Sequence, residues 1–286
     1  MSNPIKSLLP LAIGLALGTW YARRTEQPAS PRLGETASQA HIRRQMAQLK
    51  REYEKQDRMR RDFTANVSHE LKTPLTSISG YAEIIREGMV KSEDVGRFAG
   101  KIYEEAQRLI VLVEDILNLS HLDEGAPGQE RRQGIDLYAL CEGAVASLAE
   151  AARQRGITLT LTGQRQTVDG AEKILGEIIF NLCDNAIKYN KENGRVEVSV
   201  TREPDWVVLT VQDTGIGIPP GETDRVFERF YRVDKSHSKE IGGTGLGLSI
   251  VKHAAAYHDA KIQLDSQLGR GTRVRVLFHP GQEARP

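Results

Sequence analysis

The sequence predicts an α+β protein, in which long helices come first and a domain with a mixed sheet follows. Apolar side chains recur at helical spacing over residues 40–122, with one turn signal between them. Residues 135–281 instead alternate helical stretches with short β-branched stretches, and the predicted strands mostly come in adjacent pairs. Such pairs favour a mixed sheet that is covered by helices on one face, an α/β sandwich.

The composition is that of an ordinary globular chain of about two domains. Of the 286 residues, 39% are hydrophobic and 27% are charged, and the net charge is +1. This balance gives no electrostatic reason to expect nucleic acid as a partner. Cys141 and Cys183 lack metal-ligand spacing, so we expect two buried free thiols, as in a reducing compartment.

The N-terminus differs from the rest, because residues 7–22 carry no charge. As a helix they would be about 24 Å long, less than the ~30 Å hydrocarbon core of a bilayer. We expect residues 1–24 to be a short membrane anchor; a cleaved signal peptide and an interfacial segment are the alternatives. Arg23 and Arg24 outnumber Lys6, which predicts that the rest of the chain, C-terminal to this segment, faces the cytoplasm. Membrane lipid and another protein in the membrane are the partners that this location implies.

A linker and a long helix are predicted next. Residues 25–40 are rich in Pro, Ser and Gly, which is typical of a linker. Ile42, Met46, Leu49 and Tyr53 then keep the 4-3-4 spacing of a coiled-coil seam. An amphipathic helix packed within one chain would have the same stripe, but no earlier helix is predicted that could cover it. We therefore favour a dimeric coiled coil.

Two antiparallel helices should form a hairpin within residues 41–125. The first is expected to end at Glu87 with Gly88 as its stop signal, and Pro74 inside it should produce a kink because proline lacks an N–H. The second is expected over residues 92–122. A single hairpin buries little apolar surface, so two hairpins should pair as a four-helix bundle in a homodimer.

A second linker is predicted over residues 126–134, before the α/β domain of residues 135–281. Within that domain we expect helices at 136–155, 171–189 and 245–257, and strands at 157–162, 195–201, 206–212, 262–266 and 272–278.

The stretch DTGIGIP, residues 213–219, follows one of these strands. Asp213 is positioned to accept a hydrogen bond from an exocyclic amine, and Gly215 and Gly217 would let the backbone approach a planar ligand. The pattern is short enough to arise by chance, so by itself it is a weak indication.

The stretch GGTGLGLSI, residues 242–250, is a glycine-rich loop that leads into a helix. Free amides at a helix N-terminus bind phosphate. The loop lacks the ending of a Walker motif and the strand of a dinucleotide fingerprint, so a structural turn is an equal alternative. The candidate binding residues are Gly243, Thr244, Gly245, Leu246 and Gly247.

The stretch NLCDNAIKYN, residues 181–190, lies on a predicted helix. Asn181, Asn185, Lys188 and Tyr189 fall on one face. A solvated face is the alternative, but it would rarely place two asparagines inside a helix, where they are poor formers. Amide oxygens are suitable ligands for Mg²⁺, and the ammonium group is suitable for phosphate.

The stretch FERFYRVD, residues 227–234, brings aromatic side chains close to Arg232. Phe227, Phe230 and Tyr231 would form a small satellite core, or a hinge that clamps the following loop over a nucleotide.

A further stretch, FTANVSHELKTPLTSISGYAE, precedes all of these and contains His69. Taken in order, the five stretches closely resemble the H, N, G1, F and G2 boxes of bacterial sensor histidine kinases, in the style of the phosphate-sensor-like kinases. The resemblance covers residues 40–280. It implies a dimerization and phosphotransfer hairpin followed by a Bergerat-type ATP-binding domain.

By matching position, the resemblance makes His69 the phosphoacceptor. Glu70 would take the proton from one ring nitrogen, so that the other could attack the γ-phosphate of ATP. The phosphoryl group would then pass to an aspartate in the receiver domain of a response regulator. HELKT also matches the family's phosphatase motif, in which Glu70 and Thr73 orient water against the phosphorylated regulator.

The resemblance also distributes roles within the ATP-binding domain. Asn185 would hold Mg²⁺, with Asn181 in support, and Lys188 and Arg232 would hold phosphates. The remaining nucleotide contacts would come from Tyr189 in the pocket wall, Asp213 on the adenine amine, Gly215, Gly217 and the glycine-rich residues 243–247.

The chain departs from the family pattern at three places. Asn190 stands where Ser or Thr is usual, Ala171 where an Asp commonly caps the helix, and AYHDAKI (residues 256–262) replaces a histidine-Gly-Gly turn. An anti-sigma-like serine kinase is disfavoured, because such proteins lack the SHELKTPL stretch. A kinase-dead scaffold is disfavoured, because Asn185 and Asp213 are present. A protein that acts mainly as a phosphatase remains an alternative.

Overall fold

The computed structural model describes residues 37–126, 128–233 and 243–281. Contacts between residues divide the chain after Asp62 into two units, which are described separately. Among the described residues, no helix is long and apolar enough to cross a membrane. The predicted anchor at residues 1–24 lies outside the described residues.

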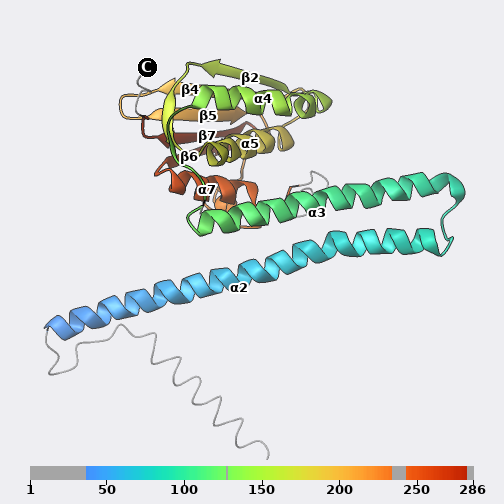
Figure 1. Ribbon diagram of the computed structural model, residues 1–286, viewed down its shortest axis with the longest axis horizontal. Helices are drawn as coiled ribbons and strands as arrows, with labels where there is room; N and C mark the ends of the chain where they lie inside the picture. Colours follow the sequence, from blue (N-terminus) through green and yellow to red (C-terminus); the bar gives the residue numbers. More distant parts are fainter. Residues whose placement is uncertain (1–36, 127, 234–242, 282–286) are drawn as a thin grey trace, which may run out of the picture. The chain divides into compact units, whose positions relative to one another are not determined.

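Helix α2 (Ala37–Arg86) begins in the first unit and continues into the second (Figure 1). In the first unit, Ile42, Met46, Leu49 and Tyr53 are all more than half exposed. The predicted apolar stripe therefore lies on the surface of α2, where a second copy of the chain could cover it.

The hairpin of the second unit has the predicted order. Backbone bonds from Gly88 to Ile85 and from Met89 to Ile84 end α2, and Gly88 has a φ of 69°. This is a Schellman arrangement, in which glycine avoids a Cβ penalty at positive φ. The second predicted helix starts with the 3₁₀ turn η2 (Ser92–Asp94) and continues as α3 (Val95–Asp123).

A five-stranded mixed sheet forms the α/β domain, in the order β2-β4-β5-β7-β6 (Figure 1). The β2–β4 pair is parallel and the other pairs are antiparallel. Helix α4 packs on α5 and β2, α5 on β5 and β4, and α7 on α5 and β6, which gives the predicted helical layer. The elements are α4 (Leu137–Gln154), β2 (Thr158–Gly163), α5 (Glu172–Lys188), β4 (Arg195–Arg202), β5 (Val207–Asp213), η3 (Arg225–Phe227), α7 (Gly247–Tyr257), β6 (Lys261–Gln267) and β7 (Gly271–Phe278).

Two short strands were not predicted. Strand β1 (Arg132–Asp136) pairs antiparallel with β3 (Thr167–Gly170), so residues 132–134 belong to a strand and not to the predicted linker. Neither segment has enough residues for a clear alternation, and the pairing is set by contacts between distant parts of the chain. At the end of β1, Asp136 caps α4 by accepting a hydrogen bond from Ala139 N at 3.1 Å.

The core lies between the helical layer and the sheet. Val196, Val198 and Val200 alternate along β4 and are fully buried. Cys141 and Cys183 are buried free thiols, as predicted. Burial raises the pKa of both thiols, so neither is a reactive thiolate near neutral pH.

Candidate functional site

One cavity of about 510 Å³ opens beside α5, the end of β5 and the start of α7. Its walls are mostly apolar, with a few polar side chains, which is the usual character of a small-molecule site. Most of the residues predicted to bind the nucleotide line it: Asn185, Lys188, Tyr189, Asp213, Gly217, Arg232, Gly243, Thr244, Gly245 and Gly247.

Asp213 presents one carboxylate oxygen to the protein. Its Oδ1 accepts hydrogen bonds from Gly215 N at 2.7 Å and Thr272 N at 3.2 Å. Among the described residues, Oδ2 has no hydrogen-bond partner, so it can accept one from a ligand in the cavity. Burial raises the pKa of Asp213, although the two backbone bonds oppose this shift.

The glycines after β5 are needed for packing within the protein. Gly217 has a φ of 67°, and a Cβ there would collide with the carbonyl of Gln267. A Cβ at Gly215 would collide with the carbonyl of Tyr189, and Gly215 is outside the cavity wall. Both glycines therefore let the loop lie close to its own chain, and Gly217 also lines the cavity, where the approach of a planar ligand stays a prediction.

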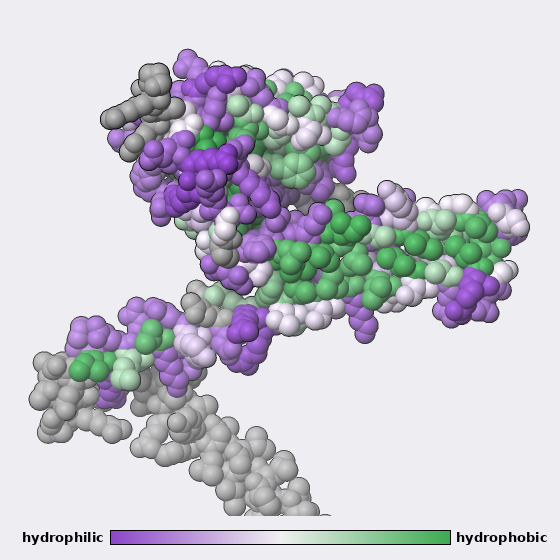
Figure 2. Space-filling model, viewed as in Figure 1, coloured by the Kyte–Doolittle hydropathy of each residue, from purple (hydrophilic) through white to green (hydrophobic). Residues whose placement is uncertain are grey.

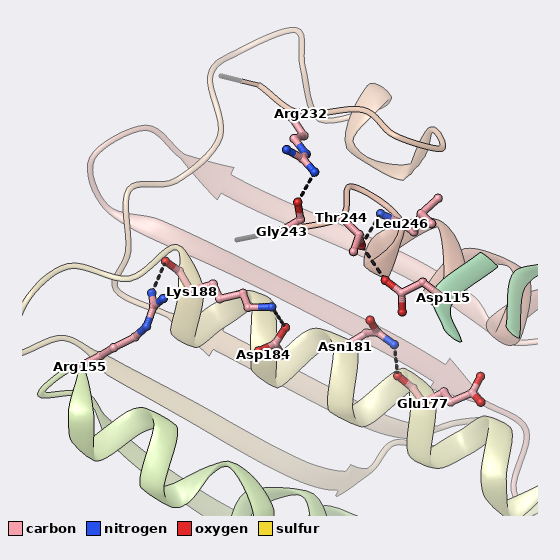
Figure 3. Close-up of polar contacts among 10 residues, drawn as sticks. All are labelled: Asp115, Arg155, Glu177, Asn181, Asp184, Lys188, Arg232, Gly243, Thr244 and Leu246. Atoms are coloured by element: carbon pink, nitrogen blue, oxygen red, sulfur yellow. Dashed lines mark hydrogen bonds and ion pairs between the residues drawn. The ribbon is translucent and has the colours of Figure 1, made fainter. Parts of the chain in front are cut away.

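The polar face of α5 is only partly directed to the cavity. Asn185 lines it, whereas Asn181 does not and donates from Nδ2 to Glu177 O at 2.8 Å (Figure 3). Lys188 Nζ lies 2.6 Å from Asp184 Oδ2. This ion pair holds the ammonium group at the cavity wall, because the two side chains lie one turn apart.

The glycine-rich segment closes another side of the cavity. Helix α7 begins at Gly247, where a Cβ would approach the side-chain oxygen of Asn181. Thr244 Oγ1 accepts a hydrogen bond from Leu246 N at 3.2 Å. The Leu246 side chain is fully buried in the core and outside the cavity wall, so the predicted contact of Leu246 with the nucleotide would have to come from its backbone.

The FERFYRVD stretch connects the glycine-rich segment to the hairpin. Phe230 N donates to Gly245 O at 2.9 Å, and the Phe230 ring lies 5.7 Å from the ring of Phe63 on α2. Arg232 donates to Gly243 O, and its guanidinium lies 3.7 Å from Glu70 Oε2. Burial lowers the pKa of Arg232, and the Glu70 carboxylate opposes this shift.

His69 itself is open to solvent, with 80% of its side chain exposed. Its Nδ1 lies 3.9 Å from Glu70 Oε1, which is longer than a hydrogen bond. Thr73 Oγ1 donates to His69 O at 3.2 Å. His69, Glu70 and Thr73 are outside the cavity wall, although Glu70 reaches Arg232, which is part of it.

Several residues of the cavity were not predicted. The most informative is Asp115 on α3, whose Oδ2 accepts a hydrogen bond from Thr244 Oγ1 at 2.6 Å (Figure 3). Burial raises the pKa of Asp115. Asp115 lies between Leu112 and Leu119, two buried residues of the apolar stripe of α3. A carboxylate within an otherwise apolar stripe is unusual, and this was the signal in the sequence that could have identified Asp115.

The departures at Ala171 and in the AYHDAKI stretch are related in space. No side chain caps α5 at Ala171. Instead, His258 Nε2 accepts a hydrogen bond from Ala171 N at 3.1 Å, and His258 Nδ1 is 2.8 Å from Ala254 O. His258 is buried, and burial lowers its pKa. It is therefore a neutral ring with the proton on Nδ1.

Within the described residues, no group of three or more histidine, cysteine, aspartate or glutamate side chains is arranged to hold a metal ion. The oxygen donor of the cavity that was predicted for Mg²⁺ is the amide of Asn185. A single amide oxygen fits a cation that takes most of its other ligands from phosphate and water.

Two family models match the chain. The "His Kinase A (phospho-acceptor) domain" matches residues 59–125, and the "Histidine kinase-, DNA gyrase B-, and HSP90-like ATPase" matches residues 170–282. Together these ranges make up more than half of the chain.

Curated relatives agree with these models. The chain is 41% identical over 224 residues to the sensor-like histidine kinase SenX3 of Mycolicibacterium smegmatis, with 77% of this chain and 58% of SenX3 covered. It is 37% identical over 233 residues to the phosphate regulon sensor protein PhoR of Pseudomonas aeruginosa, with 80% and 52% covered. The chain therefore spans little more than half the length of these relatives.

Solved structures share the fold. The histidine kinase AdeS of Acinetobacter baumannii has a TM-score of 0.62 at 23% identity, with 75% of this chain and 98% of AdeS covered. Full-length ShkA in complex with AMPPNP has a TM-score of 0.57 at 26% identity, with 78% of this chain and 47% of ShkA covered.

Proposed function

Because this chain belongs to the sensor histidine kinases, we propose that it transfers the γ-phosphoryl group of ATP to His69 and then to an aspartate of a response regulator. The observation that carries the proposal is the cavity, whose wall combines Asn185, Lys188, Asp213 and Arg232 in one place. The ATP analogue in the ShkA complex supports the choice of nucleotide.

The adenine base would lie at the Asp213 end of the cavity. Asp213 Oδ2 would accept a hydrogen bond from the exocyclic amine, because Oδ1 already binds the backbone of Gly215 and Thr272. Apolar side chains such as Ile218 and Leu264 would pack on the ring. The unpaired acceptor selects an amine, so a base with an oxo group at the same position should bind poorly.

The phosphates would lie between α5 and the start of α7. Lys188 and Arg232 supply positive charge, and Thr244, Gly245 and Gly247 supply hydroxyl and backbone groups at the N-terminus of a helix. Mg²⁺, held by Asn185 with Asn181 in support, would neutralise charge that develops on the phosphate oxygens. Phosphoryl transfer depends mainly on such positioning and electrostatics.

At His69, the lone pair of Nε2 would attack the γ-phosphorus, and the bond from phosphorus to the β,γ-bridging oxygen would break to release ADP. Glu70 would accept the proton from Nδ1, so a small rotation must shorten their distance of 3.9 Å. Because Glu70 also lies 3.7 Å from Arg232, that rotation would be coupled to a residue of the phosphate site.

A phosphatase activity toward the phosphorylated regulator is the second function that we propose for this hairpin. Glu70 and Thr73 lie one helical turn apart, and both would orient water in the proposed reaction. In the structure, Thr73 donates to His69 O and Glu70 is near Arg232. The phosphatase state would therefore need Glu70 to leave Arg232, whereas Thr73 keeps acceptor lone pairs for water while it donates to His69 O.

The hairpin would act as a homodimer. Apolar surface gathers along its two helices in Figure 2, and exposed large apolar side chains include Leu75, Tyr103, Ile110, Val113 and Leu117. A contiguous apolar stripe of this kind needs a partner, and a second hairpin would cover it as a four-helix bundle.

Membrane attachment through residues 1–24 is also a proposal. It rests on the uncharged run of residues 7–22 and on the flanking positive charges. Membrane lipid and a sensory membrane protein would then be partners of the chain. Fractionation of cells that express the full chain or residues 36–286 tests this: only the full chain should be found with the membranes, and equal distribution would contradict it.

Incubation of the full chain with γ-labelled ATP and Mg²⁺, beside His69→Gln, tests the proposed kinase. We expect the wild type to incorporate label that is labile in acid and stable in alkali, and the variant to incorporate none. α-Labelled ATP is the control and should leave no label on the protein. Acid-stable label, or label that persists in His69→Gln, would contradict the proposal.

A further inference from the structure

A carboxylate of the hairpin accepts a hydrogen bond from a hydroxyl group that is expected to bind the nucleotide phosphates. Asp115 lies on α3 and lines the cavity, and its Oδ2 accepts the hydroxyl proton of Thr244 at 2.6 Å (Figure 3). Thr244 belongs to the glycine-rich segment at the start of α7. A hydroxyl has one proton to donate, so Asp115 and a phosphate oxygen cannot both accept it.

The charges around Asp115 also indicate that its carboxylate and a phosphate group compete for the same place. Burial raises the pKa of Asp115 and Asp184 also disfavours its charge, while the hydrogen bond from Thr244 and the nearby ammonium group of Lys188 favour the ionised form. Lys188 is one of the two cations assigned to phosphate. A phosphate group that arrived at Lys188 and Thr244 would place a second anion beside the Asp115 carboxylate, in a partly buried site where repulsion is strong.

A second carboxylate of the hairpin also contacts a residue of the proposed phosphate site. Glu70 of α2 lies 3.7 Å from Arg232, the other cation assigned to phosphate. Two carboxylates from the two helices of the hairpin are thus directed at two groups of the proposed phosphate site.

A third acidic contact lies elsewhere. Asp123 at the end of α3 accepts from Arg229 Nη2 at 2.7 and 2.8 Å and lies 3.1 Å from His253 Nδ1. Neither Asp123 nor Arg229 lines the cavity. This contact joins α3 to the α/β domain through residues outside the proposed phosphate site. It therefore differs from the contact of Asp115, which involves a residue of that site.

We propose that Asp115 sets the affinity of the chain for ATP, because its carboxylate takes the place of a phosphate oxygen on Thr244 when no nucleotide is bound. This rests on the proposed function of the cavity as an ATP site. Binding of the triphosphate must displace Asp115, and by linkage the nucleotide must weaken the hold of α3 on the glycine-rich segment. The contact between the hairpin and the glycine-rich segment thereby depends on whether ATP is bound.

Calorimetric titration of the full chain with Mg²⁺ and a non-hydrolysable ATP analogue tests the proposal. The variant is Asp115→Asn, which removes the charge and keeps the size, with Asp115→Ala as a second variant. The matched control is Glu114→Gln, since Glu114 is the adjacent acid on α3 and is exposed. We expect both Asp115 variants to bind the analogue about three- to tenfold more tightly than the wild type, and Glu114→Gln to bind equally.

Titration with adenosine separates competition for phosphate from a general change in the cavity. Adenosine lacks phosphates, so we expect the wild type and the Asp115 variants to bind it with equal affinity. Unchanged or weaker binding of the ATP analogue in both Asp115 variants would overturn the proposal, as would an equal gain for adenosine. If the wild type and all variants bound neither ligand, the proposed ATP site itself would be wrong, and this inference with it.

Discussion

Glu70 Oε2 lies 3.7 Å from Arg232 Nη2, so the residue that follows His69 faces a guanidinium of the cavity wall. Only 9% of the Arg232 side chain is exposed, and it also donates to Gly243 O. One arginine therefore contacts the hairpin and the glycine-rich segment, which is the position that the proposed coupling between nucleotide binding and phosphoryl transfer to His69 requires.

Replacement of Arg232 by Gln should slow phosphoryl transfer to His69. The variant removes a positive charge from the proposed phosphate site, and we expect a loss of about 10²-fold in the single-turnover rate at saturating ATP. Arg225→Gln is the matched control, because Arg225 is about half exposed and pairs with Glu222 at 3.4 Å. Equal single-turnover rates for the wild type and Arg232→Gln would remove Arg232 from the mechanism.

Asp213→Asn should weaken nucleotide binding while the fold is kept. The amide oxygen can still accept from Gly215 N and Thr272 N, but the amide NH₂ would then face the adenine amine, and two donors cannot pair. We expect the dissociation constant of an ATP analogue to rise by about 10- to 10²-fold, measured by calorimetry. Asp265→Asn on the exposed side of β6 should leave it unchanged, and an unchanged value for Asp213→Asn would contradict the assignment.

The buried His258 should make the stability of the chain sensitive to acid. Burial lowers the pKa of its ring below the usual value of about 6.5, so the unfolded chain binds a proton that the folded chain does not. This contribution to stability is complete above pH 6.5 and is lost as the pH falls through the lower folded pKa.

Urea unfolding between about pH 7.5 and about pH 5, a range that includes the usual histidine pKa of about 6.5, tests this contribution of His258 to stability. His258→Gln should be less stable than the wild type at pH 7.5, and its free energy of unfolding should fall less steeply as the pH is lowered. His41→Gln is the control, because His41 is exposed on α2. The same pH slope for the wild type and His258→Gln would exclude this role.

Asn190 should matter for stability although it departs from the family pattern. Its Nδ2 donates to Ala186 O and Arg195 O, and its Oδ1 accepts from Thr214 Oγ1 at 3.2 Å. These bonds join the end of α5 to β4 and to the loop after Asp213. Asn190→Ala should lower the free energy of unfolding by about 1–3 kcal/mol in urea, because partly buried groups lose their partners.

Glu192→Ala, an exposed neighbour, is the control for Asn190→Ala and should change the free energy of unfolding by less than about 0.5 kcal/mol. A similar small change for both variants would show that the Asn190 network does not stabilise this corner of the domain.

Local patterns in the sequence predicted much of the fold. The valines of β4 alternate over several residues, and Gly88 marks the end of a long periodic helix, so both elements were predicted. Strands β1 and β3 were not, because each is short and is defined by its pairing with the other. Periodicity within one segment contains no information about such a pairing.

The same distinction applies to the site. Asn185, Lys188 and Asp213 lie within short recognisable stretches, and the structure places all three on one cavity wall. Asp115 lies in a helix with no such stretch, about 130 residues from Thr244 in sequence, and only the packing of α3 on α7 brings the two together. Leu246 shows the opposite case: it lies within a recognisable stretch, yet its side chain is buried in the core and only its backbone is left to contact a ligand.

Localisation of the phosphoryl group by mass spectrometry is the most direct test of the central claim. The full chain would be incubated with Mg²⁺ and ATP, kept at alkaline pH to preserve a phosphorus–nitrogen bond, and digested before analysis. The claim predicts a phosphoryl group on the ring of His69, and none on that peptide when ATP is replaced by a non-hydrolysable analogue. A phosphoryl group on a serine, a threonine or another histidine, with His69 unmodified, would contradict it.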